Sequence, residues 1–173
     1  MQQQIQTGIR KAGKKVAATM DTDIAAPIQR VFDFVAAEDV LPKVLTGYGM
    51  LPAVVRTSGN TGPWDTPGSS RTVHLADSTT SREEVTDYAR PEYFAYRTSN
   101  YTFALKYLAT SAEGQWWFEE RQGQTHIRWT YTFTANGAIT AIPLWFFVRL
   151  QWAGYMRACL ENTRRHFSER LGT

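Results

Sequence analysis

The chain has 173 residues, of which 43 % are hydrophobic and 20 % charged. These proportions suit one globular domain with a sizeable core and exclude a disordered chain. The net charge of +3 does not indicate a nucleic-acid-binding protein, because four basic residues lie in the first fifteen positions, which contain no acid: Arg10, Lys11, Lys14 and Lys15. Without these four charges the balance becomes −1, so the rest of the chain is nearly neutral.

The composition therefore predicts a basic, polar extension over residues 1–15 and one domain over residues 16–170. Such an extension is typical of a solvated end, and attraction to phosphate or to a membrane is the alternative. The single cysteine, Cys159, cannot form an internal disulfide, which favours a reducing, cytoplasmic setting. The most apolar stretch, residues 138–156, is interrupted by Pro143, Arg149 and Gln151, which makes it a poor membrane span.

The first half of the chain predicts a strand, two helices and further strands. Residues 16–24 alternate between apolar and polar side chains, as a strand does. In residues 26–36, Pro27 suits a first helical position, and an apolar stripe at helical spacing follows it: Ile28, Val31, Phe32 and Val35. A short second helix or turn is expected to end at Gly47 or Gly49, before a strand over residues 51–57.

A long loop rich in Gly, Pro, Ser and Thr is predicted over residues 58–69. Trp64 lies within it and either pins the loop to the body of the protein or serves as a lid that contacts a ligand. Three strands are expected to follow, over residues 70–76, 81–89 and 92–99.

The second half predicts a connecting segment over residues 101–111, a hairpin around Gln122 and Gly123, and one long helix over about residues 140–168. One face of this helix is expected to carry Leu144, Val148, Trp152, Tyr155, Cys159, Thr163 and His166. Trp145, Phe146, Phe147 and Leu150 point away from that face. These four side chains need a second cover, which could be another subunit, the segment 100–110 or a membrane surface.

In this order, the elements resemble the START-like helix-grip superfamily (SRPBCC), in its polyketide cyclase/dehydrase-type branch. The resemblance rests on "IAAPIQRVFDFVA" after the first strand, on "EEVTDY" followed by "RPEYFAYR", on "GQWWFEE" with "QTHIRWTYTF", and on the long C-terminal helix. It implies an α+β helix-grip fold, in which a seven-stranded curved antiparallel sheet wraps around that helix and two short helices follow the first strand. It also implies a deep apolar cavity for a lipid, polyketide or other aromatic compound.

Aromatic residues are the candidates for contact with such a ligand. In "HIRWTYTF", residues 126–133, Trp129 and Tyr131 share one strand face with Ile127 and Phe133. The partner strand offers Trp117 or Trp116, depending on the register, and the helix offers Trp152 and Tyr155. Tyr and Trp bring polar tips that need partners, so a wall of them suits a cavity, although ordinary core packing is the alternative. Trp64 is a further candidate.

The polar residues suggest one possible catalytic group. Hydrolytic motifs, metal-ligand spacings and a dinucleotide fingerprint are missing from the sequence, so we predict no cofactor and no metal. Arg71 alternates with Val73 and Leu75 and is expected to face the core. Cyclase-type relatives place polar side chains from the next strand in the pocket, at positions that match Arg82 and Glu84, but those relatives have a serine and an arginine there.

A buried Glu84 beside Arg71 or Arg82 could act as a general base in an aldol cyclisation or dehydration. A structural ion pair and a solvated strand face are the two alternatives. We therefore expect a protein that binds a small hydrophobic ligand, with a cyclase or dehydratase as the alternative. Nucleic acid is not expected as a partner, and a homodimer or a weak membrane contact through Trp145, Phe146, Phe147 and Leu150 is possible.

Overall fold

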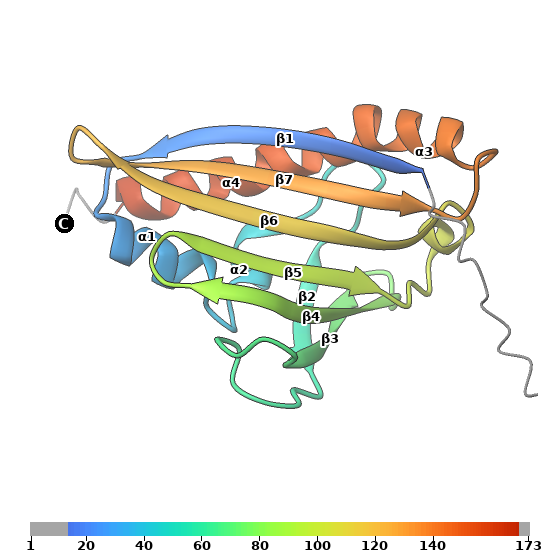
Figure 1. The fold of residues 1–173 in the computed structure, drawn as a ribbon, viewed down its shortest axis with the longest axis horizontal. Helices are drawn as coiled ribbons and strands as arrows, with labels where there is room; N and C mark the ends of the chain where they lie inside the picture. Colours follow the sequence, from blue (N-terminus) through green and yellow to red (C-terminus); the bar gives the residue numbers. More distant parts are fainter. Residues whose placement is uncertain (1–13, 170–173) are drawn as a thin grey trace, which may run out of the picture.

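The computed structural model describes residues 14–169, in which a curved antiparallel sheet wraps around a long C-terminal helical segment (Figure 1). The sheet has seven strands in the order β1-β7-β6-β5-β4-β3-β2. The predicted helix-grip architecture is confirmed. Of the expected N-terminal extension, residues 1–13 lie outside the described part of the chain. The strands are β1 (Lys15–Ile24), β2 (Val54–Ser58), β3 (Ser70–Leu75), β4 (Thr80–Ala89), β5 (Tyr93–Ser99), β6 (Ala109–Arg121) and β7 (Gln124–Ala135).

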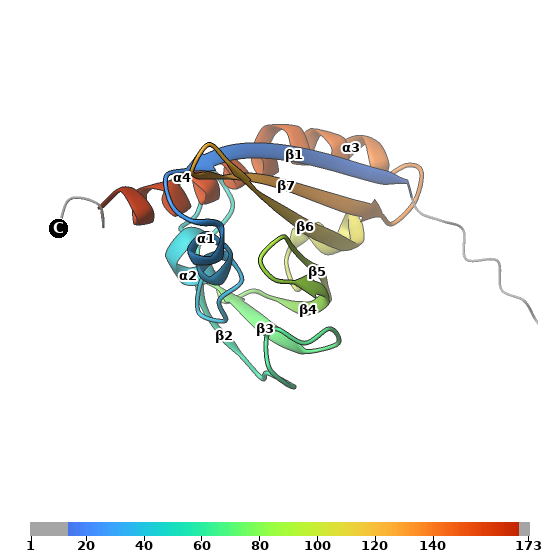
Figure 2. The same cartoon turned by 60° about the vertical axis from the view of Figure 1, so that its left-hand side comes forward.

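Two short helices, α1 (Ile28–Val35) and α2 (Leu41–Val44), follow β1 as expected. The apolar stripe of α1 is buried, and Phe32 meets Phe118 of β6 with ring centroids 5.1 Å apart. The chain leaves α2 through Gly47 and Gly49, whose φ angles of 98° and 57° suit glycine. Figure 2 shows α1 and α2 together at one side of the curved sheet, while the C-terminal helix runs along the sheet.

The hairpin between β6 and β7 turns at Gln122 and Gly123, which both have positive φ angles, of 52° and 77°. A two-residue turn of this kind pairs Arg121 with Gln124 and places Trp116 directly opposite Trp129. The register of the two longest strands therefore follows from the turn.

The C-terminal helix is continuous over residues 141–169. We expected one uniform α-helix, but the structure interrupts it with a π-helical turn. An α-helix, α3 (Ala141–Phe147), leads into one π-helical turn, η2 (Val148–Trp152), and then into α4 (Ala153–Glu169). A π-turn adds a residue to the helix and rotates the residues after it about the helix axis, and such turns are frequent at functional sites. This turn ends at Trp152, one of the residues expected to contact a ligand. A short 3₁₀ helix, η1 (Ala104–Tyr107), occupies the connecting segment before β6.

The aromatic face of β7 serves two purposes. Ile127 and Phe133 are completely buried in the core, and Phe133 packs edge-on against Trp152 at 5.2 Å between ring centroids. Between them, Trp129 and Tyr131 are buried as well, but they also border an open space. In the part of the chain that the structure describes, no helix has the length and apolar character needed to cross a bilayer.

Candidate ligand-binding site

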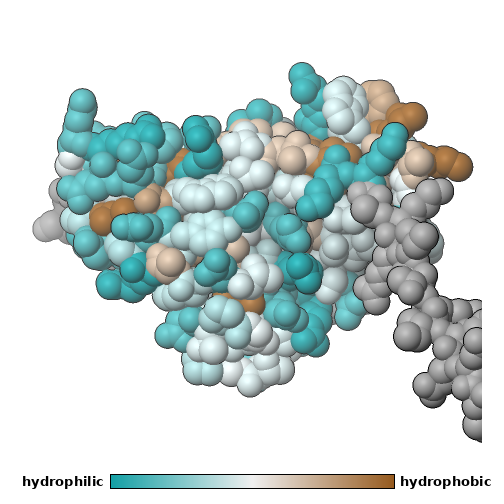
Figure 3. Space-filling view, in the orientation of Figure 1, coloured by the Kyte–Doolittle hydropathy of each residue, from teal (hydrophilic) through white to brown (hydrophobic). Residues whose placement is uncertain are grey.

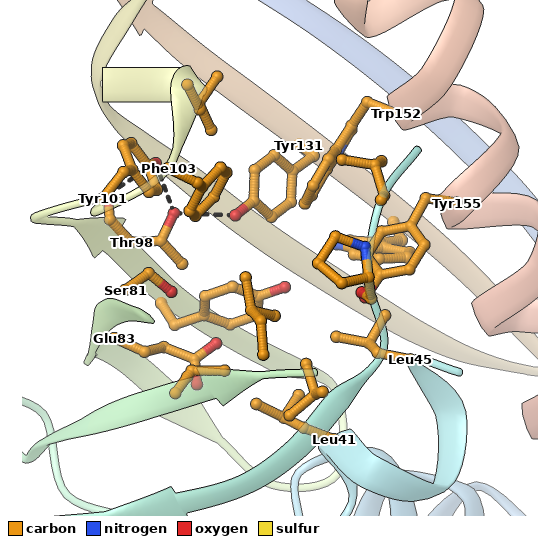
Figure 4. Close-up of a pocket in the computed structure, with 18 residues that line it drawn as sticks. Leu41, Leu45, Ser81, Glu83, Thr98, Tyr101, Phe103, Tyr131, Trp152 and Tyr155 are labelled. Atoms are coloured by element: carbon orange, nitrogen blue, oxygen red, sulfur yellow. Dashed lines mark hydrogen bonds between the residues drawn. The ribbon is translucent and has the colours of Figure 1, made fainter. Parts of the chain in front are cut away.

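A cavity lies between the sheet and the helical segment, and about 80 Å³ of it is open to the centres of water-sized molecules (Figure 4). This space is large enough for several waters or for part of a small organic molecule. Its wall is mainly apolar, with contributions from α2, from β2 to β5, from β7 and from the helix. The residues that line it include Leu41, Leu45, Leu51, Pro52, Leu75, Ser81, Glu83, Tyr96, Thr98, Tyr101, Phe103, Trp129, Tyr131, Trp152 and Tyr155.

Four of the six aromatic residues predicted from the sequence line this cavity. Trp129 and Tyr131 come from β7, and Trp152 and Tyr155 come from the helix. The ring centroids of Tyr131 and Trp152 are 4.6 Å apart, and those of Trp152 and Tyr155 are 5.4 Å apart. These contacts form one continuous aromatic wall from the sheet to the helix.

The tyrosine hydroxyls of this wall are largely satisfied by the protein itself. Thr98 Oγ1 lies 2.8 Å from the hydroxyls of both Tyr101 and Tyr131, and Tyr155 donates a hydrogen bond of 3.1 Å to the carbonyl oxygen of Pro52. Burial raises the pKa of Tyr101, Tyr131 and Tyr155 above the usual value. The tyrosines therefore stay neutral and hold the wall in place.

The most buried charges of the site belong to a cross-strand pair, Arg71 on β3 and Glu83 on β4. Nη2 of Arg71 lies 2.8 Å and its Nε 2.9 Å from Oε2 of Glu83, and both side chains are buried. Arg71 also donates from Nη1 to the carbonyl oxygen of Glu38. Each of the three guanidinium nitrogens of Arg71 therefore contacts an oxygen of the protein, while Glu83 lines the cavity and its Oε1 accepts no hydrogen bond from Arg71.

Trp64 pins the loop before β3 to this ion pair. The Cζ atom of Arg71 lies 3.7 Å from the centre of the Trp64 ring, and Trp64 is buried. Its ring lines a smaller cavity of about 30 Å³, which shares Glu83, Tyr96 and Trp129 with the main one. Of the two roles considered for Trp64, the structure shows the contact with the body of the protein, and a ligand contact stays a prediction.

Of the alternatives considered for Glu84, the structure shows a solvent-exposed ion pair with Arg82, whereas the buried general base beside Arg71 is wrong. The Glu84 side chain is 40 % exposed on the outer face of β4 and lies 3.6 Å from Arg82, which is also exposed. Glu83 takes the inward position instead. Simple alternation groups Tyr88 with Glu84, but the register shifts between Val85 and Asp87. This β-bulge reverses the alternation for the residues after it, so the inward side of Tyr88 says nothing about Glu84. Val85 precedes the bulge and is buried, and Glu83, two residues before Val85, shares its inward face.

Trp117 also lies away from the cavity. Its side chain is 38 % exposed and packs on Tyr93, with ring centroids 5.4 Å apart. Trp116, the alternative considered, faces inward and stacks on Trp129 at 4.3 Å between ring centroids. The two-residue turn at Gln122 and Gly123 contained the signal that distinguishes them, because it sets the pairing of Trp116 with Trp129.

Three polar groups of the cavity are available to a ligand: two indole N–H groups and one carboxylate oxygen. Nε1 of Trp129 and Nε1 of Trp152 are buried and have no hydrogen-bond partner among residues 14–169. Oε1 of Glu83 accepts none of the hydrogen bonds from Arg71, which go to Oε2. A buried donor or acceptor without a partner costs free energy, so a ligand that supplies partners gains affinity. These groups suit a ligand with a hydrogen-bond acceptor near Trp152 or Trp129 and a donor near Glu83.

Several residues that line the cavity are only half-buried: Leu41, Leu45, Leu51, Pro52, Leu75, Ser81, Phe103 and Trp152. Five of them, Leu51, Pro52, Leu75, Ser81 and Phe103, lie on the loop before β2, on β3 and β4 and before η1, and we take this side as the mouth of the cavity. Ser81 and Glu83 project from the same face of β4, so a ligand entering past Ser81 would reach Glu83 next (Figure 4).

A curved sheet that grips a long helix across an apolar, aromatic-lined cavity defines a protein of the helix-grip class. Within that class, the chain belongs to the family described as polyketide cyclase / dehydrase and lipid transport, whose model matches residues 15–168. No curated protein sequence matches the chain. Membership in this family supports hydrophobic ligand binding or cyclase activity in general.

Solved structures share the fold at low sequence identity. The di-domain ARO/CYC BexL from the BE-7585A biosynthetic pathway matches with a TM-score of 0.65 and 23 % identity, over 88 % of this chain and 50 % of that chain. Major latex-like protein 151 from Panax ginseng matches with a TM-score of 0.67 and 10 % identity, over 90 % and 99 % of the two chains. A Thalictrum norcoclaurine synthase matches with a TM-score of 0.65 and 9 % identity, over 92 % and 98 %.

Proposed function

We propose that the protein binds one small, flat hydrophobic molecule in the cavity between its sheet and its C-terminal helix. The observation that carries this proposal is the cavity itself, which stays open beside Trp129, Tyr131, Trp152 and Tyr155. Aromatic rings of this kind offer large apolar contact at low entropic cost and fix a flat ligand by stacking.

The ligand should carry at least one polar group at each end. A carbonyl or ether oxygen would accept a hydrogen bond from Trp152 Nε1, and a hydroxyl group would donate one to Glu83 Oε1. A carboxylate beside Glu83 is disfavoured by charge repulsion. These requirements point to neutral hydroxylated aromatic ketones, a chemical class that includes the products of polyketide cyclisation, rather than to fatty acids.

Isothermal titration calorimetry with 4-hydroxyacetophenone, 2-naphthol and myristate tests this proposal. We expect saturable binding of the two neutral aromatic probes and weaker binding of myristate. A Ser81→Phe variant should fill the mouth of the cavity and weaken binding by at least about tenfold. The matched control is Thr86→Phe, at an exposed position of the same strand, which should bind as the unaltered protein does. Equal loss in both variants, or no binding of any probe, would refute the proposal.

A second candidate function, general-base catalysis on a carbonyl compound, is favoured by the buried carboxylate in the cavity wall. In this scheme Glu83 takes the role first considered for Glu84. The ligand lies with the carbon next to its carbonyl group, not its hydroxyl group, against Glu83, which removes a proton from that carbon. Arg71 orients Glu83 through two hydrogen bonds to Oε2 and does not reach the ligand itself. Trp152 Nε1 would donate to the oxygen on which negative charge develops.

Solvent deuterium exchange into the methyl group of 4-hydroxyacetophenone, followed by NMR, tests this second function. The unaltered protein should accelerate the exchange. Glu83→Gln, which is less stable because Arg71 loses its anionic partner, should lower the exchange to the rate in buffer while the folded fraction, measured by circular dichroism, keeps most of its affinity. Glu84→Gln is the matched control and should exchange normally, because Glu84 lies on the outer face. An unchanged rate in Glu83→Gln would leave the protein as a binding protein only.

A further inference from the structure

The first turns of the C-terminal helical segment are apolar on both faces. Leu144 and Val148 point inward and pack on the core. Phe147, which was expected on the outward face, is half-buried and packs on Phe133 and Trp152 instead, so that part of the expectation is wrong. Ile142, Trp145, Phe146 and Leu150 recur at helical spacing on the opposite face, and their side chains are between 47 % and 68 % exposed. Figure 3 shows hydrophobic side chains gathered over α3 at this end of the molecule. We call these four residues, together with the exposed Ile139 that precedes them, the α3 patch.

The edge of the α3 patch carries positive charge. Arg149 lies among its residues, with its Cζ atom 5.5 Å from the centre of the Trp145 ring. Lys14 lies beside the turn that leads into α3, because its carbonyl oxygen accepts a hydrogen bond of 2.9 Å from the backbone of Ala135. Lys106 of η1 lies beside the same turn, because its carbonyl oxygen accepts a hydrogen bond of 2.8 Å from Asn136.

Acidic residues are missing from the segments that form this end of the molecule. Residues 14–20, 100–112 and 134–160 contain no Asp or Glu, whereas they include Lys14, Lys15, Lys106 and Arg149, all exposed. An exposed tyrosine, Tyr107, adds to this surface, with the Nζ atom of Lys106 5.0 Å from the centre of its ring. An apolar face edged by cations and amphipathic aromatic rings has the properties of helices that lie in a membrane interface.

We propose that the α3 patch is a docking surface for an anionic lipid membrane. Apolar side chains of the patch enter the boundary between headgroups and acyl chains, and Lys14, Lys15, Lys106 and Arg149 contact the anionic headgroups. A second copy of the chain suits this surface less well, because a symmetric dimer would bring the same cations face to face. Docking at this surface does not depend on the ligand proposed for the cavity.

The position of the patch relative to the cavity adds a functional consequence. The π-turn η2 follows α3 directly and ends at Trp152, which lines the cavity. Phe147, at the end of α3, has its ring centroid 6.3 Å from that of Trp152. A membrane bound at α3 therefore lies about one helical turn from the aromatic wall. The π-turn η2 connects the two and is the element that could change the position of Trp152.

Flotation of the full chain with phosphatidylcholine vesicles, with and without phosphatidylglycerol, tests the proposal. We expect partitioning onto the anionic vesicles that decreases as salt is raised, and little onto the neutral ones. Phe146→Ser/Leu150→Ser should lower the partition coefficient by at least about tenfold, and Arg149→Gln by about fivefold. The matched controls are Val55→Ser on β2 and Arg82→Gln on β4, two exposed residues away from the patch, and neither should change partitioning.

Sedimentation analysis and near-ultraviolet circular dichroism accompany the flotation, so that misfolding of the double variant is recognised. If the double variant misfolds, the comparison of Arg149→Gln with Arg82→Gln decides alone. Three results would overturn the proposal: no binding to anionic vesicles, equal loss in patch and control variants, or a dimer that the Phe146→Ser/Leu150→Ser exchange dissociates.

Discussion

Nη2 of Arg71 lies 2.8 Å from Oε2 of Glu83, and both side chains are almost completely buried. The two residues face each other across β3 and β4, and Trp64 covers the arginine from the other side. The pair thus connects the sheet, the loop before β3 and the cavity. Its charges are held in low dielectric, where each depends on the other.

Removal of one partner of this pair should strongly destabilise the fold. We expect Arg71→Met to lower the free energy of unfolding by about 3–5 kcal/mol, because it leaves the Glu83 carboxylate buried without its cation. The double variant Arg71→Met/Glu83→Leu should recover most of that loss, since no uncompensated charge remains. Urea unfolding followed by tryptophan fluorescence measures both.

The control for this experiment is an exposed ion pair whose two residues both lie on β4. Arg82 and Glu84 lie 3.6 Å apart in contact with solvent, and Arg82→Met should change the free energy of unfolding by less than about 1 kcal/mol. Equal effects of the Arg71 and Arg82 exchanges would show that burial does not govern the strength of these pairs.

Buried tyrosines predict that the protein loses stability in alkali. Burial raises the pKa of Tyr131 well above the value of about 10 that the unfolded chain has. Above that pH the folded state binds more protons than the unfolded state, so stability falls as pH rises and is intact below it. Tyr131→Phe removes one such group and should reduce the slope by up to about 1.4 kcal/mol per pH unit.

The same variant provides its own control at neutral pH. There Tyr131→Phe should be less stable than the unaltered protein by about 0.5–1.5 kcal/mol, because Thr98 loses one hydrogen bond. The difference between the two proteins should then shrink as the pH rises above about 10. If the difference in the free energy of unfolding between the two proteins stayed constant from neutral to alkaline pH, the raised pKa of Tyr131 would be contradicted.

Cys159 should be inert in the native protein. The thiol is buried in the helix facing the core, and burial raises its pKa above the usual value. We expect labelling by a disulfide reagent at mildly alkaline pH to be at least about a thousandfold slower in the folded state than in urea. Rapid stoichiometric labelling in native buffer would show that the core opens around this helix.

Gly114 makes room for the ring of Tyr96 on the neighbouring strand. A Cβ atom at Gly114 would lie 2.4 Å from Cζ of the buried Tyr96 ring, which cannot move aside freely. Gly114→Ala should therefore cost about 1–3 kcal/mol in urea unfolding and weaken ligand binding, because Tyr96 lines the cavity. At Gly137 a Cβ atom meets nothing within 4 Å, so Gly137→Ala should stay within about 0.5 kcal/mol of the unaltered protein.

Most of the fold could be predicted from local patterns. The apolar stripe of α1, the alternation in β7 and the turn residues Gln122 and Gly123 each depend on neighbours within a few positions. Helical and strand periods are properties of the backbone, so these patterns determine the elements before any packing is known. The inward positions of Trp129, Tyr131, Trp152 and Tyr155 follow from the same periods.

The acid at the cavity could not be assigned in this way. Glu83 and Glu84 are adjacent, and the resemblance to cyclase-type relatives pointed to Glu84. Alternation along β4 does not separate the two, because the bulge between Val85 and Asp87 shifts the phase of the strand. A bulge bends its strand and increases the local twist, so it is part of the curvature of the whole sheet. Whether the aromatic wall encloses space likewise depends on how far the helix is held from the sheet.

The sequence by itself thus determined the order of the elements, the inward faces of β7 and the C-terminal helix, and the helix-grip class. Only the tertiary structure decided that Glu83 and not Glu84 borders the cavity, that Trp117 lies outside it, and that a π-turn ends at Trp152. The physical reason is that periodicity is local, whereas sheet curvature, bulges and the separation of helix from sheet depend on contacts between distant parts of the chain.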